Sequence, residues 1–126
     1  MQAFLVDLDN SPGALAKVAA AIAAKGVNIT SIGGTTCGDS GRAALTTSDE
    51  AATREALSAA GNTFTEMEIV EVSLRDEPGS LAGACRKLAD NAINLEGLLP
   101  LGMDAGGVKV GFITADAEAT RGALGS

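Results

Sequence analysis

Apolar and polar positions follow a pattern that occurs twice along this chain. In each copy, a stretch with every second residue apolar is followed by apolar residues spaced three or four positions apart. The first spacing is typical of a strand with one buried face, and the second of a helix with an apolar stripe. The alternating residues are Phe4, Val6 and Leu8, matched by Val70, Val72 and Leu74. The stripe residues are Leu15, Val18, Ala19, Ile22 and Ala23, matched by Leu81, Ala84, Cys85, Leu88 and Ala89.

The two copies also share residue identities. Residues 8–32 align with residues 74–98 at an offset of 66, with 7 identities in 25 positions. Residues 47–57 align with residues 114–124 at an offset of 67, with 7 identities in 11 positions. One inserted residue in the turn between these segments reconciles the offsets. The sequence therefore predicts a duplicated unit, a feature that must be recognised before a fold is assigned.

Each copy is predicted to form a strand, a helix, two strands and a second helix. Ser11 is suited to the N-cap of the first helix and Pro12 to its first position, where a missing N–H costs nothing. Gly26 is expected to end this helix in a left-handed conformation. The segments Thr47–Asp49 and Thr114–Asp116 offer caps for the second helix of each copy.

The first copy continues into a fourth strand, and the second does not. The apolar positions of "NTFTEMEI" (62–69) change phase at Val70, so we expect one strand to end near Ile69 and the next to begin there. This places the first unit at residues 1–68 and the second at residues 69–126, with the C-terminal strand of the second unit missing. A missing strand leaves a sheet edge that must be covered, blunted or paired with another chain.

Composition narrows the class of function. The net charge is −7 and the isoelectric point about 4.4, which argues against nucleic acid and anionic membranes as partners. The chain contains neither a basic leader nor 18 consecutive apolar residues, so we expect a cytoplasmic protein with no membrane partner. It has no histidine, which removes the commonest general base and metal ligand. We therefore predict that it is not an enzyme and that it holds no metal and no cofactor.

Two segments carry a resemblance to a known family. "DNSPGALAKVAAAIAAKGVNI" (9–29) and "RDEPGSLAGACRKLADNAINL" (75–95) each place Pro-Gly after a polar loop and Asn before the second strand. This pattern resembles the ACT domain, a small regulatory module that binds amino acids. The resemblance implies an α+β fold of two ferredoxin-like βαββαβ units packed side by side, with an antiparallel sheet and helices on one face.

The same resemblance implies a function. A stand-alone tandem ACT protein is expected to be a non-catalytic, allosteric sensor or regulatory subunit, which binds a small amino acid at the interface between units. A partner enzyme is a possible target of such a subunit. We further expect a homodimer, formed through the incomplete second unit.

The family's effector positions carry over to two loops and two asparagines. A helix start offers free N–H groups and a favourable dipole to the carboxylate of an amino acid. The implied ligand-binding residues are Asn10, Ser11, Pro12 and Gly13 with Asn94, and Asp76, Glu77, Pro78 and Gly79 with Asn28. Which asparagine faces which loop depends on how the units pair.

The two loops differ in charge, and this leaves a rival hypothesis open. Asp76 and Glu77 would oppose a bound carboxylate unless Arg75 folds over to counter them, so we predict that the Asn10–Gly13 loop is the better site. Pro-Gly also serves simply to begin a helix, and Asn suits the turn before a strand. The rival hypothesis is accordingly a protein-interaction subunit whose ligand sites are vestigial.

Overall fold

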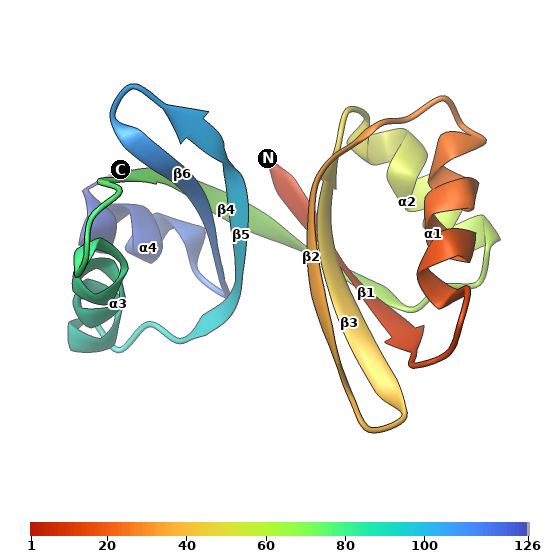
Figure 1. Ribbon diagram of the computed structural model, residues 1–126, viewed down its shortest axis with the longest axis horizontal. Helices are drawn as coiled ribbons and strands as arrows, with labels where there is room; N and C mark the ends of the chain where they lie inside the picture. The colour runs from red at the N-terminus through yellow and green to blue at the C-terminus, as the bar shows by residue number, and fades with distance from the viewer. Residues whose placement is uncertain (126) are drawn as a thin grey trace. The chain divides into compact units, whose positions relative to one another are not determined.

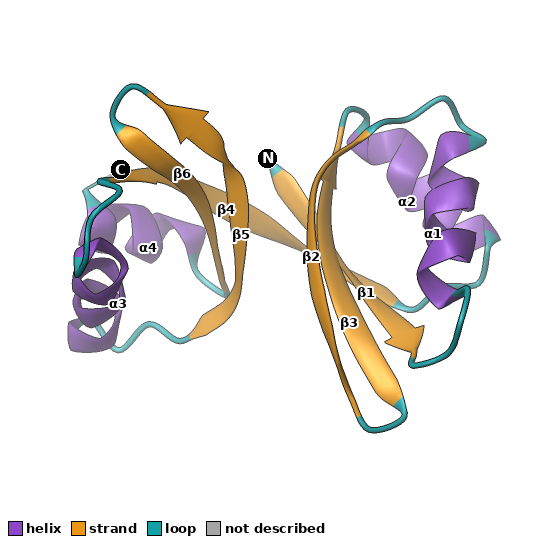
Figure 2. Ribbon diagram, viewed as in Figure 1, coloured by secondary structure: helices purple, strands orange, loops and turns teal. Residues whose placement is uncertain are grey.

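The computed structural model describes residues 1–125 and divides them into two compact units (Figure 1). The first unit comprises Gln2–Glu66, and the second begins at Met67 and includes Met1. Both units are α+β, as the sequence predicted, and the described residues form six strands and four helices (Figure 2). In chain order the elements are β1 (Gln2–Asp9), α1 (Ala14–Ala23), β2 (Ile29–Cys37), β3 (Ser40–Thr47), α2 (Glu50–Ala59), β4 (Phe64–Leu74), α3 (Ser80–Asp90), β5 (Leu95–Asp104), β6 (Gly107–Thr114) and α4 (Ala117–Leu124).

The first unit has the strand order of a ferredoxin-like fold, β2-β3-β1-β4. β3 is antiparallel to both β1 and β2, and it places Leu45 opposite Phe4 and Ile32. Helices α1 and α2 cover one face of this sheet (Figure 2). The core lies between the sheet and the helices and contains Phe4, Val6, Val18, Ile22, Val27, Leu45, Ala56 and Leu57. The predicted alternation of β1 and the centre of the predicted stripe of α1 are thereby confirmed.

The second unit repeats this arrangement with three strands, in the order β4-β6-β5. β6 pairs antiparallel with both β4 and β5, and α3 and α4 supply the helices. Its core contains Ala84, Leu88 and Phe112, with Val72 and Leu74 of β4 packed against them. Between Met67 and residue 125 the chain forms no fourth strand after α4, as expected.

The predicted end of a strand near Ile69 is wrong, because β4 is one uninterrupted strand of 11 residues. Its first residue, Phe64, packs against the core of the first unit, whereas Val72 and Leu74 pack in the second. Ile69 and Val70 are both buried although they point to opposite faces of the strand. The change of phase at Val70 therefore marks a stretch buried on both faces, and it does not mark the end of a strand.

The helix starts differ from the prediction in α1 and agree with it in α2 and α4. Ser11 and Pro12 precede the helix, and the N-cap of α1 is Gly13, whose φ of 87° is left-handed. A glycine adopts this conformation without the steric cost that other residues incur. In α2 and α4, the carboxylates of Asp49 and Asp116 cap the first turn as expected, accepting hydrogen bonds from backbone N–H groups at 3.0 and 2.9 Å.

The helices are all short. The longest, α3, has 11 residues, and none in the part of the chain that the structure describes has the length and apolar character needed to span a membrane.

Candidate functional site

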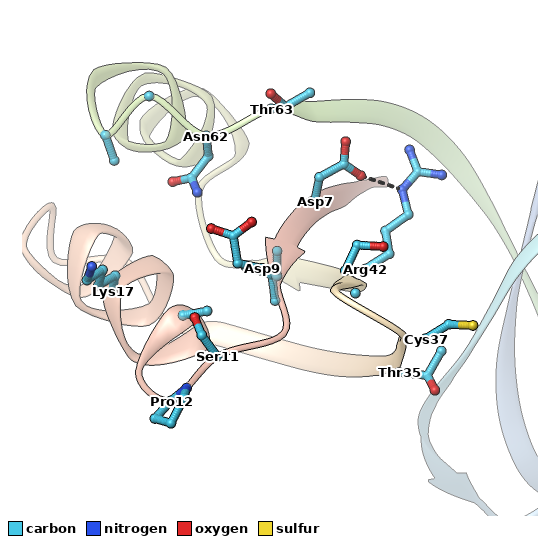
Figure 3. Close-up of a pocket in the computed structure, with 16 residues that line it drawn as sticks. Asp7, Asp9, Ser11, Pro12, Lys17, Thr35, Cys37, Arg42, Asn62 and Thr63 are labelled. Atoms are coloured by element: carbon cyan, nitrogen blue, oxygen red, sulfur yellow. Dashed lines mark ion pairs between the residues drawn. The ribbon is translucent and has the colours of Figure 1, made fainter.

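A hollow of about 800 Å³ opens beside the β1–α1 loop of the first unit (Figure 3). We call it the loop hollow. Its walls come from the end of β1, the start of α1, the β2–β3 hairpin and the α2–β4 loop. The polar and loop residues that line it include Asp7, Asp9, Ser11, Pro12, Lys17, Thr35, Cys37, Arg42, Asn62 and Thr63. Ser11 and Pro12 are thus the two predicted site residues that line this hollow.

The β1–α1 loop is fastened to the turn of the β2–β3 hairpin through Asn10. The side-chain amide of Asn10 donates a hydrogen bond to the carbonyl oxygen of Gly38 at 2.9 Å, and its backbone N–H donates to the carbonyl oxygen of Asp39 at 2.9 Å. Because both groups are engaged, Asn10 holds the loop in place. Only the amide oxygen and the second amide hydrogen of Asn10 remain available for the predicted ligand contact.

The helix that starts at this loop has no side-chain cap. The N-cap, Gly13, has no side chain to accept a hydrogen bond, and Gly79 occupies the same position in α3 with φ 94°. The first-turn N–H groups of an α-helix have no partner within the helix. In α2 and α4 an aspartate accepts from one of these groups, whereas in α1 and α3 no side chain does so. Among the described helices, the two with the Pro-Gly motif are therefore the ones in which no side-chain oxygen occupies the place where an anionic group would bind.

Four charged groups line the loop hollow, and only two of them pair with each other. The guanidinium of Arg42 contacts the carboxylate of Asp7 through Nε at 3.2 Å, and both side chains are about half exposed. Asp9 and Lys17 take part in none of the ion pairs of residues 1–125. Figure 3 shows the carboxylate of Asp9 directed toward the amide of Asn62, which comes from the α2–β4 loop.

Asp9, Lys17 and Asn62 line the hollow but lie outside the set of ligand-binding residues that the sequence predicts. They belong to the end of β1, to α1 and to the loop after α2, so no local motif contains all three. The two copies of the duplicated unit differ at two of these positions. At an offset of 66, Asp9 and Lys17 correspond to Arg75 and Gly83, so these charges differ between copies that are otherwise similar.

A second, more apolar groove lies on the β2 side of the same loop. We call it the first groove; its volume is about 580 Å³, and Asn10, Ser11, Leu15 and Ile32 are among its lining residues. Leu15 and Ile32 are 45% and 41% exposed. Leu15 belongs to the predicted apolar stripe of α1, but it lies at the rim of the helix face and not in the core.

The second unit has an equivalent but smaller groove of about 330 Å³, which we call the second groove. Asp76 and Glu77 line it together with Leu81 and Leu98, the counterparts of Leu15 and Ile32. Arg75 does turn toward the acidic pair, with Nη1 at 4.0 Å from Oε1 of Glu77. Both side chains are more than half exposed, so this contact offsets little of the negative charge.

Asn28 and Asn94 lie at the opposite end of their units from these loops. Asn28 precedes β2, and the hairpin that holds Asn10 follows β2; nine strand residues correspond to a separation of about 30 Å. The backbone N–H of Asn28 donates to the hydroxyl of Ser48, and its carbonyl accepts from the Ser48 N–H, both at 2.9 Å. The side chain of Asn94 donates to Glu96 at 3.3 Å. In neither unit does Asn28 or Asn94 lie close to the loop between the first strand and the first helix of the same unit.

Comparisons with known proteins identify the fold. The sequence matches no family model and no curated protein. Among solved structures, protein BT0572 from Bacteroides thetaiotaomicron is similar over 98% of this chain and 85% of its own, with a TM-score of 0.79 and 19% identity. The ligand-free regulatory subunit of aspartate kinase from Thermus thermophilus matches over 98% and 86%, with a TM-score of 0.68 and 24% identity. The corresponding subunit from Thermus flavus matches over 98% and 89%, with a TM-score of 0.65 and 23% identity. At these identities the likeness shows that the chain shares their fold.

Proposed function

We propose that this chain is a non-catalytic regulatory protein of the ACT type, which binds a small amino acid at the β1–α1 loop of its first unit. The observation that carries the proposal is the uncapped start of α1 beside the loop hollow, in a molecule whose other pair of helices is capped by aspartate. The N–H groups there suit the ligand's carboxylate. The shared fold with the regulatory subunits of aspartate kinase from two Thermus species supports a regulatory role, with an enzyme as the possible partner.

The proposal extends to asparagines supplied by a neighbouring unit. Asn28 and Asn94 stand far from the loop of their own unit, so each can reach a ligand only where another unit presents it. A homodimer provides such a neighbour. In this arrangement the Asn10–Gly13 loop is the stronger site, because the loop at Asp76 and Glu77 places two carboxylates close to where a ligand's carboxylate would bind.

A dye-based thermal-shift titration against the twenty L-amino acids tests this function, since the chain contains no Trp or Tyr to report binding directly. An amino acid at about a hundred times its dissociation constant adds about 2.7 kcal/mol to the free energy of unfolding. We expect one or a few small amino acids to raise the midpoint by several degrees. Asn28→Ala or Asn94→Ala is expected to reduce the shift, whereas Asn91→Ala, at the end of α3, serves as the control. A flat response to all twenty at millimolar concentration would exclude the function.

A second candidate function is a protein-interaction subunit with vestigial ligand sites. It is favoured by the apolar residues exposed at equivalent places in the two grooves, Leu15 with Ile32 and Leu81 with Leu98. Size-exclusion chromatography with light scattering distinguishes the candidates. A dimer that Leu15→Glu or Leu81→Glu dissociates, in a chain that no amino acid stabilises, supports the interaction subunit. A dimer stabilised by an amino acid supports the sensor.

A further inference from the structure

The loop hollow of the first unit carries equal numbers of acidic and basic groups. Two carboxylates, Asp7 and Asp9, and two basic groups, Lys17 and Arg42, line it, so the charges sum to zero. The chain as a whole has a net charge of −7. A lining with no net charge best matches a ligand that has one positive and one negative group. A ligand with a net charge would leave one of the lining groups without a compensating charge.

The two charges that lack a partner are of opposite sign. Asp7 and Arg42 already contact each other, whereas Asp9 and Lys17 form no ion pair within residues 1–125. The half-buried Asn62 adds an amide whose oxygen can accept from an ammonium group and whose NH₂ can donate to a carboxylate. Figure 3 shows Asn62 and Asp9 on facing sides of the same space, with Lys17 projecting from α1.

The fold does not require these charges, because the second unit forms without them. The residues that correspond to Asp7, Asp9 and Lys17 at an offset of 66 are Ser73, Arg75 and Gly83. The second unit forms the same strands and helices with these replacements.

We propose that the loop hollow binds one net-neutral α-amino acid per chain, with the carboxylate of Asp9 holding the ligand's ammonium group, and with the ammonium group of Lys17 and the N–H groups at the start of α1 holding its carboxylate. Asn62 and the hydroxyl of Ser11 are the neighbouring groups that orient it. This inference rests on the proposed function, and it assigns the recognition of charge to residues that all belong to one unit. An asparagine from a neighbouring unit then adds affinity without recognising the ligand's two charges, and the second unit, with Arg75 and Gly83 at these positions, lacks this pair of charges.

The ligand's two charges are tested separately by isothermal titration calorimetry on the full chain. Each of the twenty L-amino acids is titrated alone, and every amino acid that binds is compared with its amide and its N-acetyl derivative. The amide lacks the carboxylate, and the N-acetyl derivative lacks the ammonium group. We expect one site per chain, binding of amino acids with uncharged side chains only, and at least about tenfold weaker binding of both derivatives.

The assigned residues are tested with variants that keep the shape of each side chain. Asp9→Asn and Lys17→Gln are each expected to weaken binding about tenfold or more, since each removes a charge-assisted contact. The matched controls are Asp90→Asn, at the end of α3, and Lys25→Gln, near the C-terminus of α1; both are expected to leave the dissociation constant unchanged. All four side chains are exposed, so the unliganded thermal midpoints are expected to stay close to that of the parent chain.

The possible results separate this inference from the function on which it rests. If an amino acid binds and neither Asp9→Asn nor Lys17→Gln weakens it, the assignment of these residues is overturned and the regulatory function stands. Preferential binding of a charged amino acid, such as glutamate or lysine, overturns the neutral ligand class. If no amino acid binds at millimolar concentration, both the inference and the proposed function fail.

Discussion

The duplication supplies a matched pair of core substitutions, Leu57→Ala in α2 and Leu124→Ala in α4. The two leucines occupy the same place in the related segments "TREAL" and "TRGAL". Leu57 is completely buried in the core of the first unit. Leu124 is the last residue of α4 and is only partly buried against the core of the second unit.

The expected losses follow from this difference in burial. Full burial of a leucine side chain contributes about 1.5–3 kcal/mol, and the cavity left by truncation raises the cost of a buried Leu→Ala change to about 2–5 kcal/mol. For Leu57 we expect a loss of about 3–4 kcal/mol in the free energy of unfolding. For Leu124, which still contacts water and sits at a helix end where the chain can adjust, we expect about 1–2 kcal/mol.

Urea denaturation followed by far-ultraviolet circular dichroism measures both losses. The midpoint is expected to fall for each variant, with the larger fall for Leu57→Ala and with little change in the denaturant slope. Ala56→Gly is not a suitable control, since it changes helix propensity as well as packing. Equal losses for the two leucines, or a larger loss at Leu124, would refute the inference that the cost follows the burial of each leucine.

Three further predictions concern a helix cap, two turns and an ion pair. Asp49→Ala removes the cap of α2 and is expected to cost about 1 kcal/mol in urea denaturation, with Asp49→Asn costing less because it keeps an acceptor; equal costs would contradict the cap. Gly26→Ala places a side chain at φ 73° and is expected to lower the free energy of unfolding by about 1 kcal/mol. Ala92→Gly relieves a φ of 55° and is expected to raise the free energy of unfolding by about a few tenths of a kcal/mol. Changes of the same sign would contradict the left-handed conformation of these two turns. The hydrogen bonds from Arg54 lower the pKa of Glu66 below its usual 4.5, so the pair contributes stability above that pH and loses it as the pH falls through the lowered pKa. The thermal midpoint of the parent chain is therefore expected to fall more steeply than that of Glu66→Gln below about pH 4.5, and parallel curves would show that the pair contributes nothing.

The order of the elements could be predicted because each element is indicated by the spacing of its own apolar residues. The alternation in β1 and the helical spacing in α1 can each be recognised from the residues of that one element alone. The aspartate caps at residues 49 and 116 were found for the same reason. Alternation cannot reveal that the other face of a strand is also buried, as it is at Ala3 and Leu5. For the same reason the phase change at Val70 suggests the end of a strand, although Ile69 and Val70 are both buried in β4.

The candidate site was predicted only where a motif marks it. Pro12 and Gly13 identify the loop, although they precede the helix and do not begin it as regular helical residues. Asp9, Lys17 and Asn62 come together through the folding of β1, α1 and the α2–β4 loop. Nothing in the immediate sequence of any one of them indicates the other two. The difference between the copies at Asp9 and Lys17 is a signal of function only once the structure shows what the differing residues line.

The continuous β4 strand also limits how the two units can be exchanged in evolution or by design. Phe64 at its start packs in one core and Leu74 at its end in the other, with no linker between them. A recombination point placed at the boundary of the units, near Glu66, falls inside a strand and splits the hydrogen-bonded ladder that continues with β6 from Ile69. Workable crossover points lie in the loops on either side, at residues 60–63 and 75–79. A chimaera therefore inherits β4 whole, and the part of each core that β4 supplies comes from a single parent.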